Sequence, residues 1–230
     1  MPSRLLLFDI DGTLLDTGGS GGSALLDAAE ETLGARREDL PPLDLAGATD
    51  SGVIKKLFSD SGQLMKPELV EAFHQNYLKR LSARMHHEGF QGRLLPGVEI
   101  LLSRLISDSR HSIGLLTGNL RRGADIKLQR FQIAHHFADG GFGDDAEHRN
   151  DIGPVAVRRM ETKTQLRFSP QEIIVIGDTP KDIACAHAMG ARCLAVTTGK
   201  FDTATLSPFS PWKLLDDLSD TTKVLSLFSS

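Results

Sequence analysis

A short apolar run that ends in paired carboxylates constrains the fold of this chain more than any other stretch. The run Leu5-Leu6-Leu7-Phe8 has no alternation of apolar and polar residues, which is typical of a strand buried on both faces of a parallel sheet. It leads directly into Asp9-Ile10-Asp11-Gly12-Thr13. In open α/β sheets, functional residues follow the carboxyl ends of such strands. Because acids this close together repel each other, the stretch predicts a cation or a shared proton between them, unless it is only an Asp-Gly turn.

Two later apolar runs also end in polar residues. Ile113-Gly114-Leu115-Leu116 continues into Thr117-Gly118-Asn119, and Ile173-Ile174-Val175-Ile176 continues into the stretch from Gly177 to Asp182. Helical patterns separate these runs, and a further strand pattern follows at Arg192 to Val196. The alternation predicts an α/β fold, in which a parallel sheet has helices on both faces.

The polar residues at these strand ends are expected to lie together, because the carboxyl ends of neighbouring parallel strands meet at one edge of a sheet. The set consists of Asp9, Asp11, Thr117, Asn119, Asp178 and Asp182. Its carboxylates cannot all stay ionised without a cation. A site with only oxygen ligands favours Mg²⁺. Each strand end taken alone could instead be a turn with helix-capping residues.

The residues from 17 to 91 show no strand pattern and are expected to form an all-helical insert. Their apolar residues recur at helical spacing from Ser23 to Gly34, around Val53 to Phe58 and after Pro67. We therefore expect two domains, a core of residues 1–16 and 92–230 and an insert of residues 17–91. The glycine run from Gly18 to Gly22 lacks the lysine of a phosphate-binding loop, so a flexible hinge is the better interpretation.

Composition and charge argue against several classes of function. The 230 residues carry 26 Lys and Arg, which are scattered, against 30 Asp and Glu, and the net charge is −4. Neither a nucleic-acid nor a membrane partner is expected, because there is no basic patch and no apolar run of the roughly 18–20 residues that span a bilayer. With no signal-peptide pattern, and with Cys185 and Cys193 in no pairing pattern, we expect a cytoplasmic protein. The oligomeric state stays open.

The ordered motifs at the three strand ends resemble motifs one, two and four of the haloacid dehalogenase superfamily. The resemblance covers the whole chain, which is most similar to the phosphoglycolate phosphatase-like group. It implies a Rossmann-like parallel-sheet core with an inserted helical cap. It also implies a Mg²⁺-dependent phosphatase that hydrolyses small phosphomonoesters, with an aspartyl-phosphate as the intermediate. The expected partner is therefore a small phosphorylated metabolite.

The resemblance also assigns roles to individual residues. Asp9 would be the nucleophile and Asp11 the general acid and base. The implied metal ligands are the carboxylates of Asp9 and Asp178 and the backbone carbonyl of Asp11, with Asp182 beside or behind them. The implied phosphate-binding residues are Thr117, Gly12, Thr13, Gly118 and Asn119. In the cap, Thr49 and Asp50 lie where related proteins carry a substrate-specificity loop, although they could simply begin a helix.

The third motif of the family is the one departure. It normally supplies a lysine, whereas the matching stretch from His148 to Pro154 has none. Arg149 is the best candidate for the same positive charge, because a guanidinium also binds phosphate and carboxylate oxygens. The alternative is that Arg149 is a solvated loop residue, in which case Lys163 would be the next candidate.

Two other classes of activity stay open from the sequence. A phosphosugar mutase of the same superfamily would keep all of these motifs. A catalytically degenerate binding protein on the same fold would explain the missing lysine, although the acids at the three strand ends argue against it. A dehalogenase is disfavoured because it would lack the second acid, Asp11.

Overall fold

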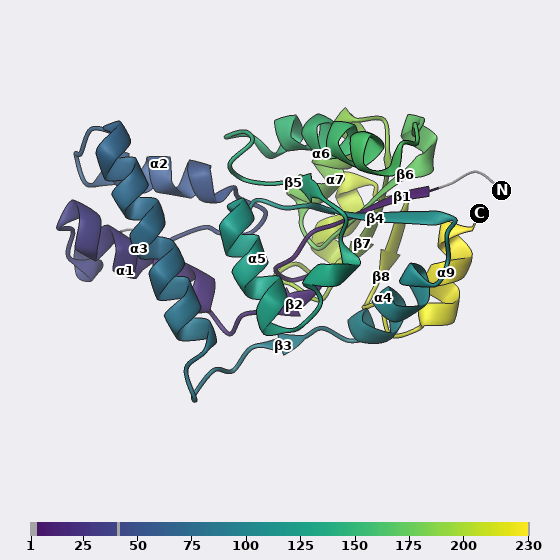
Figure 1. Cartoon of the computed structure of the whole chain (residues 1–230), viewed down its shortest axis with the longest axis horizontal. Helices are drawn as coiled ribbons and strands as arrows, with labels where there is room; N and C mark the ends of the chain where they lie inside the picture. Colours follow the sequence, from purple (N-terminus) through teal and green to yellow (C-terminus); the bar gives the residue numbers. More distant parts are fainter. Residues whose placement is uncertain (1–3, 41, 230) are drawn as a thin grey trace.

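The computed structural model describes residues 4–40 and 42–229 and contains a six-stranded parallel sheet (Figure 1). The strand order is β5-β4-β1-β6-β7-β8, so β1 lies between the two other strands whose ends carry motif residues. The α/β fold predicted from the sequence is confirmed. The strands are β1 (Arg4–Phe8), β4 (His111–Leu116), β5 (Gly140–Gly141), β6 (Ile173–Gly177), β7 (Arg192–Val196) and β8 (Lys213–Leu215).

The side chains of β1 show why its sequence does not alternate. Leu6 and Phe8 belong to the hydrophobic core on one face of the sheet, whereas Leu5 and Leu7 belong to the core on the other face. In register, Leu7 pairs with Gly114 of β4 and with Val175 of β6. A strand with two buried faces and two parallel neighbours needs apolar residues at every position.

Helices cover both faces of the sheet, as Figure 1 shows. The first face is packed by α4 (Val98–Ile106), α5 (Arg121–Arg130) and α9 (Thr221–Phe228). The second face is packed by α6 (Arg149–Thr164), α7 (Pro180–Ala188) and α8 (Thr203–Leu206). Short 3-10 helices occur at Arg37–Asp39, Ala134–His136, Pro170–Glu172 and Ser207–Phe209. Over residues 4–40 and 42–229, every helix is too short or too polar to span a membrane.

A helical insert leaves the core after β1 and returns before α4. It contains α1 (Ser20–Leu33), α2 (Asp50–Asp60) and α3 (Pro67–Met85), which share a hydrophobic core of their own. Its two connections run side by side as the antiparallel strands β2 (Leu15–Asp16) and β3 (Arg93–Leu94). We did not predict this ribbon, because strands of two residues are too short to show a periodicity.

Several helix ends differ from the sequence-based expectation. The second half of the glycine run, expected to be a hinge, forms the first turn of α1. From the sequence we expect the next two helices to begin at Asp151 and at Ile183, whereas α6 begins at Arg149 and α7 begins at Pro180. The start of α7 is fixed by a reciprocal cap, in which the side chain of Thr179 accepts from the Asp182 amide and the Asp182 carboxylate accepts from the Thr179 amide.

Candidate active site

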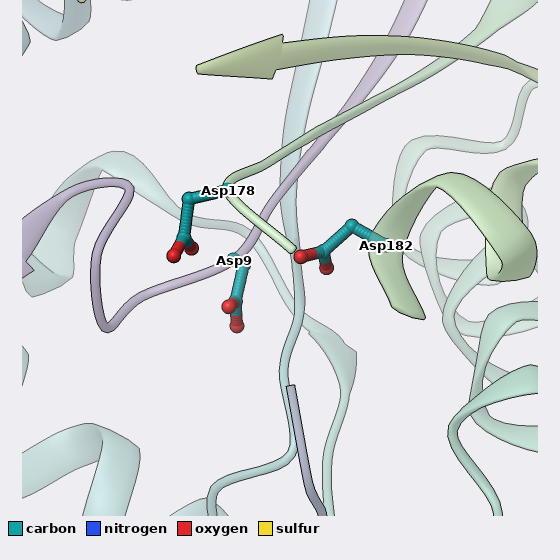
Figure 2. A group of neighbouring side chains, drawn as sticks. All are labelled: Asp9, Asp178 and Asp182. Atoms are coloured by element: carbon teal, nitrogen blue, oxygen red, sulfur yellow. The ribbon is translucent and has the colours of Figure 1, made fainter. Parts of the chain in front are cut away.

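Three buried carboxylates converge where β1 and β6 end and α7 begins. Asp9 directly follows β1, Asp178 directly follows β6, and Asp182 lies in the first turn of α7. Figure 2 shows the three side chains grouped at this point, and one oxygen of each lies within 4.8 Å of the others. They are 4%, 3% and 0% exposed. The predicted convergence of acids from separate segments is therefore present.

The electrostatics of this cluster favour a bound cation. Burial raises the pKa of Asp9 to about 6, against the opposing charge of Arg149. Burial, followed by repulsion from Asp182 and Asp9, raises the pKa of Asp178 to about 8. The only contact of the Asp178 side chain with a donor among the described residues is with the Thr13 hydroxyl, at 3.0 Å. Buried carboxylates in excess over positive charge provide the oxygen ligands that divalent ions prefer, so the cluster could hold a metal ion.

Glycines leave the space that Asp178 occupies. A Cβ atom added to Gly12 or to Gly199 would collide with the Asp178 carboxylate. Gly12 also has a φ of +81°, in the left-handed region where other residues are strained. The Thr198 hydroxyl donates to the Gly12 carbonyl at 2.6 Å, which ties the loop after β7 to the loop after β1. The glycine in the first motif is therefore needed both for the turn and for the approach of Asp178.

Arg149 provides the positive charge of this cluster. It is the first residue of α6 and only 6% exposed. Its Nη2 lies 3.2 Å from Asp9 Oδ1, and it donates to Asp182 Oδ1 and to the Leu116 carbonyl. Burial alone would lower the pKa of Arg149, but the charges of Asp182 and Asp9 outweigh it and raise that pKa. Arg149 is thus a buried partner of the acids and is not a solvated loop residue.

Lys163, the other candidate for this charge, is exposed near the C-terminal end of α6. The fourteen residues from Arg149 to Lys163 correspond to about 21 Å along a helix. The structure therefore brings Arg149, and not Lys163, to the carboxylates.

Asp11 lies in a second, separate hydrogen-bonded group. The Asn119 amide donates to Asp11 Oδ2 and to Thr117 Oγ1, each at 2.8 Å. The Lys127 ammonium donates to Asp11 Oδ2 at 2.6 Å and to Asn119 Oδ1. Lys127 is only 4% exposed. The residues of the second motif, Thr117 and Asn119, thus meet the second acid of the first motif.

The sequence analysis missed Lys127. It lies on α5 between the buried residues Ala124 and Leu128, at the spacing of one helical face. A lysine in an apolar stripe is the available signal, because lysine is seldom fully buried without a partner.

A cavity of about 350 Å³ opens beside these groups. It is lined by Asp9, Asp11, Thr117, Gly118, Asn119, Arg149 and Asp178 from the core and by residues 43–48 of the insert. Lys200, which the sequence analysis did not select, also lines this cavity, and its Nζ lies 3.5 Å from Asp44 Oδ1. Residues 43–48 therefore form a cover over the carboxylates.

Thr49 and Asp50 attach this cover to the core. Thr49 accepts from the Gly52 amide as the N-cap of α2 and donates to the Glu147 carbonyl at 2.7 Å. The Asp50 amide donates to the Gly118 carbonyl at 2.7 Å, and the Asp50 carboxylate accepts from the Leu120 amide at 2.9 Å. Thr49 thus begins the helix, whereas the Asp50 side chain points towards the core.

Comparison with known proteins is consistent with this geometry. The sequence model of the family described as haloacid dehalogenase-like hydrolase matches residues 6–196. A phosphoglycolate phosphatase of Aliivibrio fischeri is 26% identical over 225 residues, which cover 97% of each chain. The pyrophosphatase PpaX of Bacillus cereus is 23% identical over 232 residues, which cover 98% of each chain.

Solved structures share the fold over its whole length. A hydrolase from Pseudomonas syringae superposes with a TM-score of 0.73 at 21% identity and covers 99% of this chain and 100% of its own. CbbY from Rhodobacter sphaeroides, solved in complex with phosphate, superposes with a TM-score of 0.72 at 18% identity over 95% of this chain and 96% of its own. The α/β core with a helical insert is therefore the architecture of known proteins.

Proposed function

Because the chain belongs to the haloacid dehalogenase-like hydrolases, we propose that it is a Mg²⁺-dependent phosphatase that hydrolyses small phosphomonoesters through an aspartyl-phosphate on Asp9. The observation that carries this proposal is the contact between Asp9 and Arg149, which both line the 350 Å³ cavity. A nucleophile for a phosphate dianion needs a fixed cation beside it to offset charge repulsion. Residues 1–16 and 92–230 form the catalytic core in this proposal, and residues 17–91 form the cap.

Asp9 and Asp11 divide the chemistry between them. Asp9 attacks phosphorus, the bond from phosphorus to the ester oxygen breaks, and Asp11 gives a proton to the leaving oxygen. A water molecule then attacks phosphorus and transfers a proton to Asp11, and the bond between phosphorus and Asp9 breaks. Both side chains line the 350 Å³ cavity, so both can reach one bound phosphate ester. With its pKa raised to about 6, Asp9 is still ionised at neutral pH, as a nucleophile must be.

The carboxylates of Asp9 and Asp178 and the backbone carbonyl of Asp11 would hold Mg²⁺. When bound, the ion would supply positive charge against the phosphate and the acids. Asp182 is the remaining acid of the cluster, and its two oxygens already accept from Arg149 and from Thr179. We therefore assign Asp182 to orienting Arg149 from behind the metal ligands. Thr117 and the backbone around Gly12, Thr13, Gly118 and Asn119 would hold the phosphoryl oxygens.

Phosphate release from a panel of small phosphomonoesters tests the proposal. The panel includes p-nitrophenyl phosphate and 2-phosphoglycolate, the latter because of the names of the relatives, and acetyl phosphate, an acyl phosphate, is assayed beside them. We expect turnover with Mg²⁺ and a loss of at least about 10²-fold after removal of the metal with EDTA. A chain that released no phosphate from any member of the panel in Mg²⁺ would contradict the proposal.

Magnesium should stabilise the protein more at high pH than at low pH. The folded-state pKa values of Asp9 and Asp178, about 6 and about 8, exceed the ordinary value of 3.8. Between about pH 4 and pH 8, the metal-free folded protein therefore holds protons that the unfolded chain has lost. The stability that these two carboxyl groups contribute is full below about pH 4, and it is lost as the pH rises to about 8. Mg²⁺ binds the ionised form.

Thermal unfolding with and without Mg²⁺ measures this effect. The rise in Tm should be larger at about pH 8.5 than at about pH 5.5. In Asp178→Asn, the rise should be small at both pH values. An equal rise at both values in the unmodified protein would argue against binding by these carboxylates.

Two alternative functions were left open by the sequence, a catalytically degenerate binding protein and a phosphosugar mutase. The missing third-motif lysine was the one feature that favoured a degenerate binding protein, and Arg149 beside Asp9 now supplies a positive charge at that place. This supports a phosphatase. A phosphosugar mutase would share the site, and product analysis with a sugar phosphate separates an isomerised phosphate ester from free phosphate.

A further inference from the structure

A second cavity, of about 170 Å³, lies between the insert and the core. It meets the larger cavity at Asp11 and Asn119, which line both. Leu25, Val53 and Tyr77 enclose it from the insert, and Lys127 encloses it from α5. If Asp11 protonates the leaving oxygen, the group attached to that oxygen lies on this side of Asp11. The cavity is therefore placed to receive the part of the substrate that leaves.

Hydrogen-bonding capacity in this cavity is left over after its own contacts are made. The Lys127 ammonium has three protons, and two of them go to Asp11 and Asn119. The Oδ2 atom of Asp50 accepts from the Leu120 amide at 2.9 Å and from the Tyr77 hydroxyl at 3.2 Å. The other oxygen of Asp50 accepts no hydrogen bond from residues 4–40 and 42–229. Lys127 thus keeps one donor, and Asp50 one acceptor, for a ligand.

We propose that this cavity is the leaving-group site and that it selects short, uncharged alcohols with a second hydroxyl group over carboxylates of the same size. The proposal rests on the phosphatase function proposed above and names its substrate class. A hydroxyl group both accepts from Lys127 and donates to Asp50. A carboxylate only accepts, so it would leave the Asp50 oxygen without a donor, and a site built to hydrogen-bond a hydroxyl group rejects groups that cannot donate.

The charged residues that line this cavity also favour an alcohol over a carboxylate. The cavity contains one cation, Lys127, and two acids, Asp11 and Asp50. Burial raises the pKa of Asp50 to about 6, with the charge of Lys127 opposing, so this carboxyl is mostly ionised at about pH 7.5. An incoming carboxylate could reach Lys127 only by approaching the like charge of Asp50, whereas an alcohol meets no such repulsion.

The volume limits the size of the leaving group. A protein cavity of about 150 Å³ holds a benzene ring. The 170 Å³ cavity therefore admits about six or seven non-hydrogen atoms, a short alcohol and not a hexose. This expectation departs from the names of several relatives, the phosphoglycolate phosphatases, whose named substrate carries a carboxylate.

Two pairs of substrates test the selectivity directly. In each pair, a terminal CH₂OH replaces a carboxylate: 2-hydroxyethyl phosphate against 2-phosphoglycolate, and glycerol 3-phosphate against 3-phosphoglycerate. For the unmodified protein with Mg²⁺, we expect kcat/KM to be at least about tenfold higher for the alcohol in each pair. Equal or higher kcat/KM for the carboxylate in either pair would overturn the proposal.

Asp50→Asn tests the origin of the selectivity. The amide removes the charge and retains an oxygen for the Leu120 amide, so the preference for the alcohol should fall at least about fivefold, mainly through a lower KM for the carboxylates. The matched control is Asp60→Asn, on the same helix, where Asp60 pairs with Lys56 at 2.8 Å outside the cavity. This control should keep the original preference. An unchanged preference in Asp50→Asn would overturn the role of Asp50.

Acetyl phosphate separates the failure of this inference from the failure of the proposed function. Its small leaving group needs little protonation, so it reports phosphoryl transfer without selection by Lys127 and Asp50. If acetyl phosphate is hydrolysed but the carboxylates are preferred, only the selectivity proposal falls. If neither acetyl phosphate nor any of the four esters releases phosphate, the proposed function falls together with the selectivity.

Discussion

Replacing Asp9 by asparagine is expected to abolish phosphatase turnover while leaving the fold intact. The variant loses the attacking oxygen, and removal of a nucleophile from a catalytic group that acts as a unit costs about 10⁴-fold or more in kcat. Asparagine has the same shape and can still accept from Arg149, which lies 3.2 Å from Asp9 Oδ1. Steady-state phosphate release measures the loss, and circular dichroism with thermal unfolding measures the fold.

One outcome of the Asp9→Asn experiment would contradict the assignment of Asp9 as the nucleophile. Near-native turnover by a folded Asp9→Asn protein would show that another group attacks phosphorus. Asp39→Asn is a suitable control, because Asp39 is an exposed residue of the insert that pairs with Arg36 at 2.7 Å. It should retain the activity of the unmodified protein, since exposed ion pairs contribute little.

Replacing Arg149 by alanine is expected to lower both activity and stability. Without the guanidinium, no cation from residues 4–40 and 42–229 contacts Asp9, and the loss of one such electrostatic partner costs about 10²–10³-fold in kcat. Asp9 and Asp182 would also be left buried without their shared partner. Breaking a buried ion pair on one side lowers the free energy of unfolding by about 3–5 kcal/mol. Assays at saturating Mg²⁺ and denaturant titrations measure the two effects.

Lys163→Ala and Arg149→Lys are the informative comparisons. Lys163 is exposed near the end of α6, so its loss should change neither the activity nor the free energy of unfolding beyond experimental error. Arg149→Lys keeps the charge and restores the residue usual in the family, so it should recover part of the activity. If Lys163→Ala were more damaging than Arg149→Ala, the role of the third motif would pass to Lys163.

The order of elements in the core could be predicted because each long strand carries its own signal. Leu5 to Phe8 and Ile173 to Ile176 are apolar at every position, and both strands are buried on both faces. The edge strand β5 could not be found, because Gly140–Gly141 has no apolar run. Its place follows from the pairing of Leu115 with Gly140, which depends on the folded chain.

The acids of the candidate site were accessible from the sequence, and their positive partners only in part. Asp9 and Asp178 follow strands that can be recognised, so their meeting follows from the rule for parallel sheets. Arg149 stood out because the family motif has a lysine there. Lys127 lies on a helix whose buried face is visible only as a spacing, and a lysine on such a face is ordinarily read as exposed. The side-chain direction of Asp50 depends on contacts between the insert and the core.

Trapping the phosphorylated protein tests the central claim most directly. Asp11→Asn should still accept a phosphoryl group from acetyl phosphate, whose leaving group needs little protonation, but should hydrolyse the product slowly because it lacks the base. After an acid quench, peptide mass spectrometry should find about one phosphoryl group per chain, located on Asp9. A phosphoryl group on another residue, or continued turnover with no burst and no phosphorylated peptide, would contradict the account.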